Sequence, residues 1–273
     1  MTEPDFAART PSAPPTITSA TPGAASRRGW LAGGAAALAA AAVAPGIRLI
    51  EVAQAAPSAG PTGAGAGEGA NPKVRWGLLI DSTKCDAGCD ACVKACGQEN
   101  GLSSTLPDRQ RPQWIRKVAL TEIKSGRQSS APMMCQHCAE PPCVDVCPTG
   151  ASFKRADGLV LVDRHACIGC RYCMMACPYK ARSFVHEPLT GQAPRVPRGQ
   201  GCVEGCTLCV HRLDRGDKTT ACAEACTKAG HGAIVFGDLA DPDSEIARRV
   251  REIASTQLRA DLGLDPGVRY HGI

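Results

Sequence analysis

Residues 167–178 read CIGCRYCMMACP, with Cys167, Cys170, Cys173 and Cys177 separated by two, two and three residues and followed by a proline. On a tight loop, three thiolates at this spacing can reach three corners of one small cubane. The fourth thiolate lies a helical turn further along the chain, points elsewhere and ligates a neighbouring cubane. The run therefore predicts ligands for two adjacent 4Fe–4S clusters.

Three further groups of four cysteines repeat this arrangement with altered spacing. Numbered along the chain, group one is Cys85, Cys89, Cys92 and Cys96, group two is Cys135, Cys138, Cys143 and Cys147, group three is the run above, and group four is Cys206, Cys209, Cys222 and Cys226. All 17 cysteines lie between residues 85 and 226, so sixteen form four groups and Cys202 is left over. The recurrence predicts four 4Fe–4S clusters as the cofactors.

Two other uses of cysteine compete with this interpretation. Disulfides are expected in exported proteins, but cysteines two or three residues apart are poor mutual partners, and an odd total leaves one unpaired. Structural zinc takes four cysteines, but it normally combines two separated pairs. A zinc-binding structural adaptor stays open as an alternative, as does a catalytic iron–sulfur enzyme in which one cluster lacks a cysteine ligand.

The composition limits the other possibilities. The chain has only three Trp, three Tyr and four Phe, so its large side chains would build a thin core and something else must fill the interior. The formal net charge is +5, which is too small to indicate nucleic-acid binding. The sequence has no Ser/His/Asp set, phosphate loop or open-site metal motif, which argues against substrate chemistry of its own.

The N-terminus has the anatomy of a signal peptide. Arg27-Arg28 precedes a weakly apolar run over residues 31–44, and residues 53–55 fit a small-residue cleavage site. We predict a twin-arginine signal peptide at 1–55 and a flexible linker at 56–73; the alternative is an uncleaved membrane anchor. Export by this route would deliver a folded, cluster-loaded protein to the periplasm, where it would attach to the membrane through a partner only.

The spacing of the groups predicts how the rest of the chain is organised. Groups two and three are close together and complete one ferredoxin-like unit, whereas groups one and four are left to pair across it. The predicted parts are a first module at 74–129 plus 187–240, a second module at 130–186, and a C-terminal helix and tail at 241–273. Short strands are expected at 75–81 and 159–163. The fold class is α+β, with two ferredoxin-like 4Fe–4S modules, one inserted in the other, and long loops.

At this point the sequence resembles a known family. Residues 135–179 (CQHCAEPPCVDVCPTGASFKRADGLVLVDRHACIGCRYCMMACPY) and 236–250 (FGDLADPDSEIARRV) are similar to the four-cluster iron–sulfur subunits that serve polysulfide, nitrite and dimethyl sulfoxide reductases. Within the family, the chain looks closest to the exported iron–sulfur subunits of the membrane complex linked to dissimilatory sulfite reductase. The resemblance extends from about residue 74 to the end of the sequence.

The resemblance implies four ligand sets. Set one is Cys85, Cys89, Cys92 and Cys226; set two is Cys96, Cys206, Cys209 and Cys222; set three is Cys135, Cys138, Cys143 and Cys177; set four is Cys147, Cys167, Cys170 and Cys173. Group one departs from the commoner C-x2-C opening, because three residues separate Cys85 from Cys89. Cys202 is an alternative ligand to Cys206.

The expected function is one-electron transfer between two docked partners. The resemblance implies a quinone-reactive integral membrane subunit on one side and a periplasmic partner such as a multihaem cytochrome on the other, in dissimilatory sulfur metabolism. The alternative is the electron-transfer subunit of a molybdopterin reductase of the polysulfide, nitrate or dimethyl sulfoxide type. Both interpretations describe a subunit of an oxidoreductase complex that is not itself the enzyme.

Two kinds of residue near the cysteines have open roles. His137 lies between two cysteines of group two, and a packing or hydrogen-bonding role is favoured over ligation of iron. The basic residues close to the groups either raise cluster potentials, steer a partner or form a solvated surface. They are Lys84, Lys94, Lys154, Arg155, Arg164, Arg171, Lys180 and Arg182.

Overall fold

The computed structural model describes residues 70–107 and 110–273. The predicted signal peptide and most of the predicted linker lie outside these residues. The described part combines short helices with small sheets, as expected of an α+β fold. Within it, no helix is long and apolar enough to span a bilayer.

A three-stranded sheet occupies the centre of the core. Strand β1 (Trp76–Asp81) pairs antiparallel with β8 (Ile234–Asp238) and parallel with β9 (Val268–His271), so that the order is β8-β1-β9. The interior residues of β1 are buried, and the flanking strands pair its backbone on both edges. The strand predicted at 75–81 is therefore confirmed, whereas β9 lies in what the sequence suggested only as a tail.

Helices α2 (Ala91–Asn100) and α6 (Ala221–Lys228) contact each other and carry cysteines of groups one and four. The side chain of Thr220 caps α6 by accepting a hydrogen bond from the backbone of Ala223. Helix α2 ends at Gly101, whose φ of 61° is readily adopted by glycine. Two groups more than 100 residues apart are thereby brought face to face.

Groups two and three lie among shorter elements. Helices α3 (Pro142–Asp145) and α4 (Tyr172–Ala176) contact each other, and two small hairpins support them. The hairpins pair β4 (Ser152–Lys154) with β5 (Val160–Val162), and β6 (Arg182–Phe184) with β7 (Val203–Gly205). The strand predicted at 159–163 corresponds to β5.

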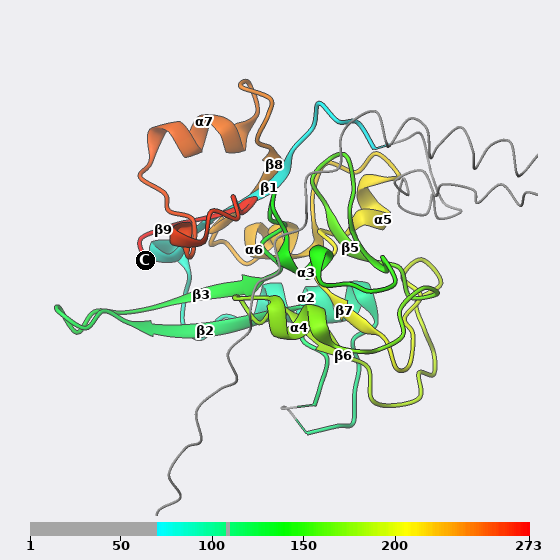
Figure 1. The fold of residues 1–273 in the computed structure, drawn as a ribbon. Helices are drawn as coiled ribbons and strands as arrows, with labels where there is room; N and C mark the ends of the chain where they lie inside the picture. Colours follow the sequence, from blue (N-terminus) through cyan, green and yellow to red (C-terminus); the bar gives the residue numbers. More distant parts are fainter. Residues whose placement is uncertain (1–69, 108–109) are drawn as a thin grey trace, which may run out of the picture. The chain divides into compact units, whose positions relative to one another are not determined.

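A longer hairpin joins the two pairs of groups. Strands β2 (Ile115–Thr121) and β3 (Gln128–Met134) pair antiparallel and form an extended two-stranded ribbon (Figure 1). The turn of this ribbon carries Ile123, which is 98% exposed. The remaining short elements are η1 (Ser82–Lys84), α5 (Val210–Leu213) and η2 (Ala260–Leu262).

The predicted C-terminal helix is confirmed as α7 (Glu245–Glu252), which lies beside β8 (Figure 1). Ser244 caps it by accepting a hydrogen bond from the backbone of Ala247 at 3.1 Å. Ile246 is fully buried against Gly237 of β8, where a side chain larger than hydrogen would collide with it.

The core is lined with thiols as well as hydrocarbon. Its largest group of buried side chains combines the β1 residues Leu78 and Ile80 with Trp114, and it includes five cysteines. These are Cys92, Cys96, Cys206, Cys222 and Cys226. Cysteine side chains therefore occupy part of the interior that large apolar side chains fill in other proteins.

Candidate iron–sulfur centres

The thiols of set one line a single cavity between α2, α6, the β2–β3 ribbon and the start of β8. Cys85 follows η1, Cys92 lies on α2 and Cys226 on α6, while Cys89 precedes α2. Burial raises the pKa of Cys92 to about 11, and the neighbouring Cys85 and Cys226 raise it further in the same direction. The backbone N–H of Ala233 donates to the Cys226 sulfur at 3.2 Å.

Set two also shares one cavity, between α2, α6, the start of β2 and the loop that precedes α5. Burial raises the pKa of Cys96 well above its usual value, and Cys222 and Cys209 add to the effect. The Asn100 side chain donates a hydrogen bond to the Cys96 sulfur, and the Leu208 backbone N–H donates one to the Cys206 sulfur, both at 3.5 Å. These donors would stabilise negative charge on the sulfurs.

Set three lies where β3 meets the residues after α4. Burial raises the pKa of Cys138 to about 12, and its next strongest influences are Cys135, Cys143 and Cys177, the other three members of the set. Cys138 and Cys177 pack in one buried group against Cys135. The four predicted members are thus mutual neighbours.

Set four surrounds a cavity beside α4. Two backbone groups donate to its sulfurs: Ser152 to Cys147 at 3.3 Å and Val203 to Cys167 at 3.5 Å. Cys170 is the one exposed cysteine among all 17 in the chain. Set four therefore contains the most exposed thiol of the four sets.

Neighbouring sets are close enough to form a series. Cys92 and Cys96 of sets one and two lie one turn apart on α2. Cys206 of set two and Cys135 of set three line the same cavity, of about 350 Å³. Members of sets three and four pack together in one buried group around β5 and β7. The order of the sets in space is therefore one, two, three, four.

The chemistry of these donors fits 4Fe–4S clusters. Each set supplies four thiols, and backbone or side-chain N–H groups donate to sulfur in all four sets. Buried thiols with pKa values near 11 to 12 are unfavourable as free thiolates. A bound iron centre would supply the positive charge that they lack. In residues 70–107 and 110–273, no group of three or more His, Cys, Asp or Glu side chains is arranged to hold a single metal ion.

The structure separates Cys202 from Cys206. Cys206 lines the cavity of set two, and its strongest thiol neighbours are Cys96 and Cys222. Cys202 is buried beside Cys167, and its thiol donates to the backbone oxygen of Arg164 at 3.3 Å. The structure thus groups Cys206 with the other members of set two.

His137 is completely buried and hydrogen-bonded. Its Nδ1 accepts a hydrogen bond from the backbone N–H of Val160 at 3.0 Å. Burial lowers the pKa of His137 to about 3, with Arg75 and Arg182 acting in the same direction. The hydrogen-bonding role expected from the sequence is confirmed for this nitrogen.

The structure distinguishes Arg182 among the eight basic residues near the groups, because only its side chain is buried. Its guanidinium donates to the Cys143 sulfur at 3.2 Å and to the Ser152 hydroxyl at 2.7 Å. Lys94 is an exposed partner of Asp90, and Arg171 lies over the ring of Phe184 at the surface.

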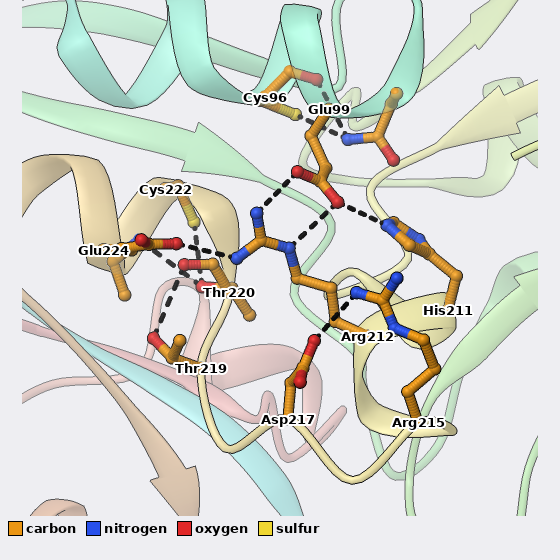
Figure 2. A network of polar contacts seen from close by, with 12 residues as sticks. Cys96, Glu99, His211, Arg212, Arg215, Asp217, Thr219, Thr220, Cys222 and Glu224 are labelled. Carbon is orange, nitrogen blue, oxygen red and sulfur yellow. Dashed lines mark hydrogen bonds and ion pairs between the residues drawn. The ribbon is translucent and has the colours of Figure 1, made fainter. Parts of the chain in front are cut away.

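A network of charges beside set two was not predicted from the sequence. Arg212 of α5 forms hydrogen-bonded ion pairs with Glu99 of α2 and Glu224 of α6, and His211 also contacts Glu99 (Figure 2). Glu99 lies more than 100 residues before Arg212 in the chain, so no local pattern could indicate their contact. The network joins the helices that carry Cys96 and Cys222.

Fold and site together define an iron–sulfur protein with four thiol sets in series. Residues 128–238 match the family described as 4Fe-4S dicluster domain. The Hdr-like menaquinol oxidoreductase iron-sulfur subunit 1 of Archaeoglobus fulgidus is 44% identical over 224 residues, covering 72% of this chain and 83% of that protein. The matching tetrathionate reductase subunit of Salmonella typhimurium is 37% identical over 212 residues, with 74% of each chain covered.

A third relative is the menaquinone reductase iron-sulfur cluster-binding subunit of Nitratidesulfovibrio vulgaris, 33% identical over 232 residues, which covers 72% of this chain and 89% of that protein. The chain belongs to this family of iron–sulfur electron-transfer subunits of oxidoreductase complexes. It carries four 4Fe–4S clusters, and the family resemblance inferred from the sequence is confirmed.

Proposed function

We propose that the protein passes single electrons along its four clusters between a quinone-reactive integral membrane subunit and a periplasmic redox partner such as a multihaem cytochrome. The serial order of sets one to four carries this proposal, because it offers one continuous route through the chain. Each cluster, when bound, supplies a site that accepts and releases one electron. The protein's own residues hold the clusters, exclude water and provide the hydrogen bonds that set their potentials.

The names of the relatives support the quinone side of the proposal. Two of them are subunits of a menaquinol oxidoreductase and a menaquinone reductase. The tetrathionate reductase relative supports a setting in dissimilatory sulfur metabolism and also keeps the second candidate open. That candidate is the electron-transfer subunit of a molybdopterin reductase, which would have the same internal route and a different partner.

We further propose that the ligands are sets one to four as defined above, and that they belong to two ferredoxin-like modules, one inserted in the other. The contact of α2 with α6 supports a first module at 74–129 plus 187–240. The contact of α3 with α4 supports a second module at 130–186. The segment 241–273 would then add α7 and the core strand β9 to the first module.

The membrane subunit is proposed to dock beside set four. Four large apolar side chains are exposed around these cysteines, and they come from α3, the group-three loop and α4. We call them the set-four patch: Val146, Ile168, Tyr172 and Met175. An apolar patch next to the one exposed cysteine suits transfer to a partner that covers it.

The proposed site of action is the periplasm, reached in the folded state by twin-arginine export. The proposal rests on Arg27-Arg28 and the weakly apolar run after it. Fractionation of cells that express a tagged chain tests it, with Arg27→Lys/Arg28→Lys as the variant. We expect the wild-type chain in the periplasmic fraction and the variant to be missing from it. An unchanged distribution of the variant between the fractions would contradict the export route.

The electron-transfer proposal is tested on the complex purified without oxygen from membranes of the native host. Mass spectrometry identifies the associated subunits, and a menaquinol analogue is added while the visible absorbance of the clusters is followed. Bleaching that requires the integral membrane subunit is expected. Clusters that stay oxidised with menaquinol but are reduced by dithionite would contradict the quinone assignment, and co-purification of a molybdopterin subunit would favour the second candidate.

A further inference from the structure

The Arg182 side chain lies between two ligand sets. It donates a hydrogen bond to the sulfur of Cys143, a member of set three, and it lines the cavity of set four. Its third contact is the hydroxyl of Ser152, the residue whose backbone N–H donates to Cys147 of set four. Arg182 therefore bridges the surroundings of the two sets.

Arg182 is a buried cation that has no carboxylate partner among the described residues. Only 8% of its surface is exposed, and its second terminal nitrogen, Nη1, has no hydrogen-bond partner in the described structure. Elsewhere the fold does pair a buried arginine: Arg198 contacts Glu204 at 2.7 Å, with both side chains almost fully buried. A buried charge without a partner is costly, so a compensating negative charge is expected close to Arg182.

The thiolates of sets three and four are the charges that can provide this compensation. Cys143 accepts a hydrogen bond from Arg182 at 3.2 Å, and Cys173 lines the set-four cavity together with Arg182. Cys143 belongs to set three and Cys173 to set four. Because an arginine guanidinium is protonated at every pH of interest, Arg182 is a fixed positive charge between two cluster sites.

We propose that Arg182 raises the reduction potentials of the clusters held by sets three and four, and so keeps the end of the route next to the set-four patch easy to reduce. Reduction adds one negative charge to a cluster, and a buried cation stabilises that charge far more than a solvated one does. The proposal rests on the ligand sets given under the proposed function. Arg182 acts through its charge and is a positioning residue that carries no electron itself.

The experiment is a redox titration of the purified four-cluster protein, followed by electron paramagnetic resonance. Arg182→Gln removes the charge and keeps a polar side chain with an N–H donor. We expect two of the four midpoint potentials to fall. At a fixed potential, the ratio of reduced to oxidised cluster should drop at least tenfold for these two clusters, which corresponds to about 59 mV for one electron. For the other two clusters this ratio should stay within threefold of the wild type.

Arg171→Gln is the matched control. Arg171 lies between Cys170 and Cys173 of set four in the sequence, but its side chain is exposed to solvent. Water and salt screen such a charge, so its removal should shift every potential by less than threefold. A shift in Arg171→Gln as large as that in Arg182→Gln would contradict the importance of burial.

Other outcomes also decide the proposal. Arg182→Gln with full iron content and four unchanged potentials would overturn it while leaving the electron-transfer function intact. Wild-type protein without four clusters would instead overturn the proposed function. If Arg182→Gln loses iron, Arg182→Lys decides, because it keeps the charge: potentials within threefold of the wild type support the proposal. If the ratio of reduced to oxidised cluster falls tenfold or more in Arg182→Lys, or if this variant loses its clusters, the potentials depend on the hydrogen-bond geometry of Arg182 and not on its charge, and the proposal is wrong.

Discussion

The carboxylate of Glu99 accepts two hydrogen bonds from the guanidinium of Arg212, over 2.9 Å from Nε and 2.5 Å from Nη2. This pair ties α2 to α5, and a third bond from Arg212 reaches Glu224 on α6 at 2.8 Å. Arg212 therefore links α2 to α6, the helices that carry Cys96 and Cys222 of set two. The pair therefore fixes the distance between thiols that must hold one cluster.

Glu99→Gln is expected to make the protein lose its clusters faster in urea, an uncharged denaturant that does not screen the ion pair. Charge-assisted bonds contribute about 1.5 to 3 kcal/mol, and the lower value applies here because Glu99 is partly exposed. If this loss of stabilisation lowers the free-energy barrier to unfolding by the same amount, unfolding becomes roughly tenfold faster. Decay of the visible absorbance under argon measures it. Asp217→Asn, which breaks an exposed pair with Arg215, is the control and should change the rate less than twofold.

The Glu99 contribution has a defined pH dependence. Hydrogen bonds from Arg212 lower the pKa of Glu99 from 4.5 to about 2. A depressed carboxylate pKa adds stability above the unfolded value of 4.5, and this stability is lost as the pH falls from there toward 2. The effect of Glu99→Gln on the rate should therefore not shrink between about pH 8 and pH 5. A penalty that vanishes within this range would show that Glu99 is not held ionised by Arg212.

Cys206→Ser and Cys202→Ser should differ in iron content. Cys206 lines the cavity of set two, so its replacement should remove or alter one cluster, with up to about four irons lost per chain. Cys202 lies beside Cys167 and Arg164, so Cys202→Ser should retain the full iron content. Iron and sulfide analysis of both variants measures this. The reverse result would make Cys202 the ligand.

Cys170→Ser should give unstable protein with a low yield and less iron. Although Cys170 is exposed, it is a proposed ligand of set four, and the free energy of metal binding contributes to folding in such sites. Cys202→Ser serves as the control for loss of a thiol. Normal yield with full iron content in Cys170→Ser would exclude Cys170 as an essential ligand.

Ile168→Ser together with Met175→Gln should weaken association with the membrane subunit. Both side chains belong to the set-four patch, and removing two apolar anchors is expected to raise the Kd by about tenfold or more. The iron content should not change, because neither residue is a ligand. Ile123→Ser, at the exposed turn of the β2–β3 ribbon, is the matched control. Equal loss of binding in the control would argue against docking at set four.

Local sequence patterns predicted those parts of the fold that local interactions determine. The apolar run before Cys85 forms β1, and the Asp243-Ser244 start followed by Ile246 and Val250 forms the capped helix α7. The family resemblance implied the four ligand sets, and the structure brings the thiols of each set close together. A cubane reaches only a few ångströms, so ligands of one cluster have to be neighbours.

The remaining features depend on contacts between distant residues. Strand β9 pairs with β1 across almost 200 residues, and no local signal marks it as part of that sheet. Strand β3 contains Pro132, which weakens a strand assignment from sequence but is tolerated at an edge of a two-stranded ribbon. The burial of Arg182 could not be predicted either, because in the sequence Arg182 is one of eight basic residues near the cysteines and nothing local distinguishes it.

The central claim is tested most directly by measuring iron, zinc and acid-labile sulfide per chain on protein purified without oxygen. We expect about sixteen irons and sixteen sulfides with negligible zinc, as four cubanes require. About twelve of each would point to a missing or altered cluster, with set one and its C-x3-C opening the first to examine. Stoichiometric zinc without sulfide would contradict the electron-transfer function.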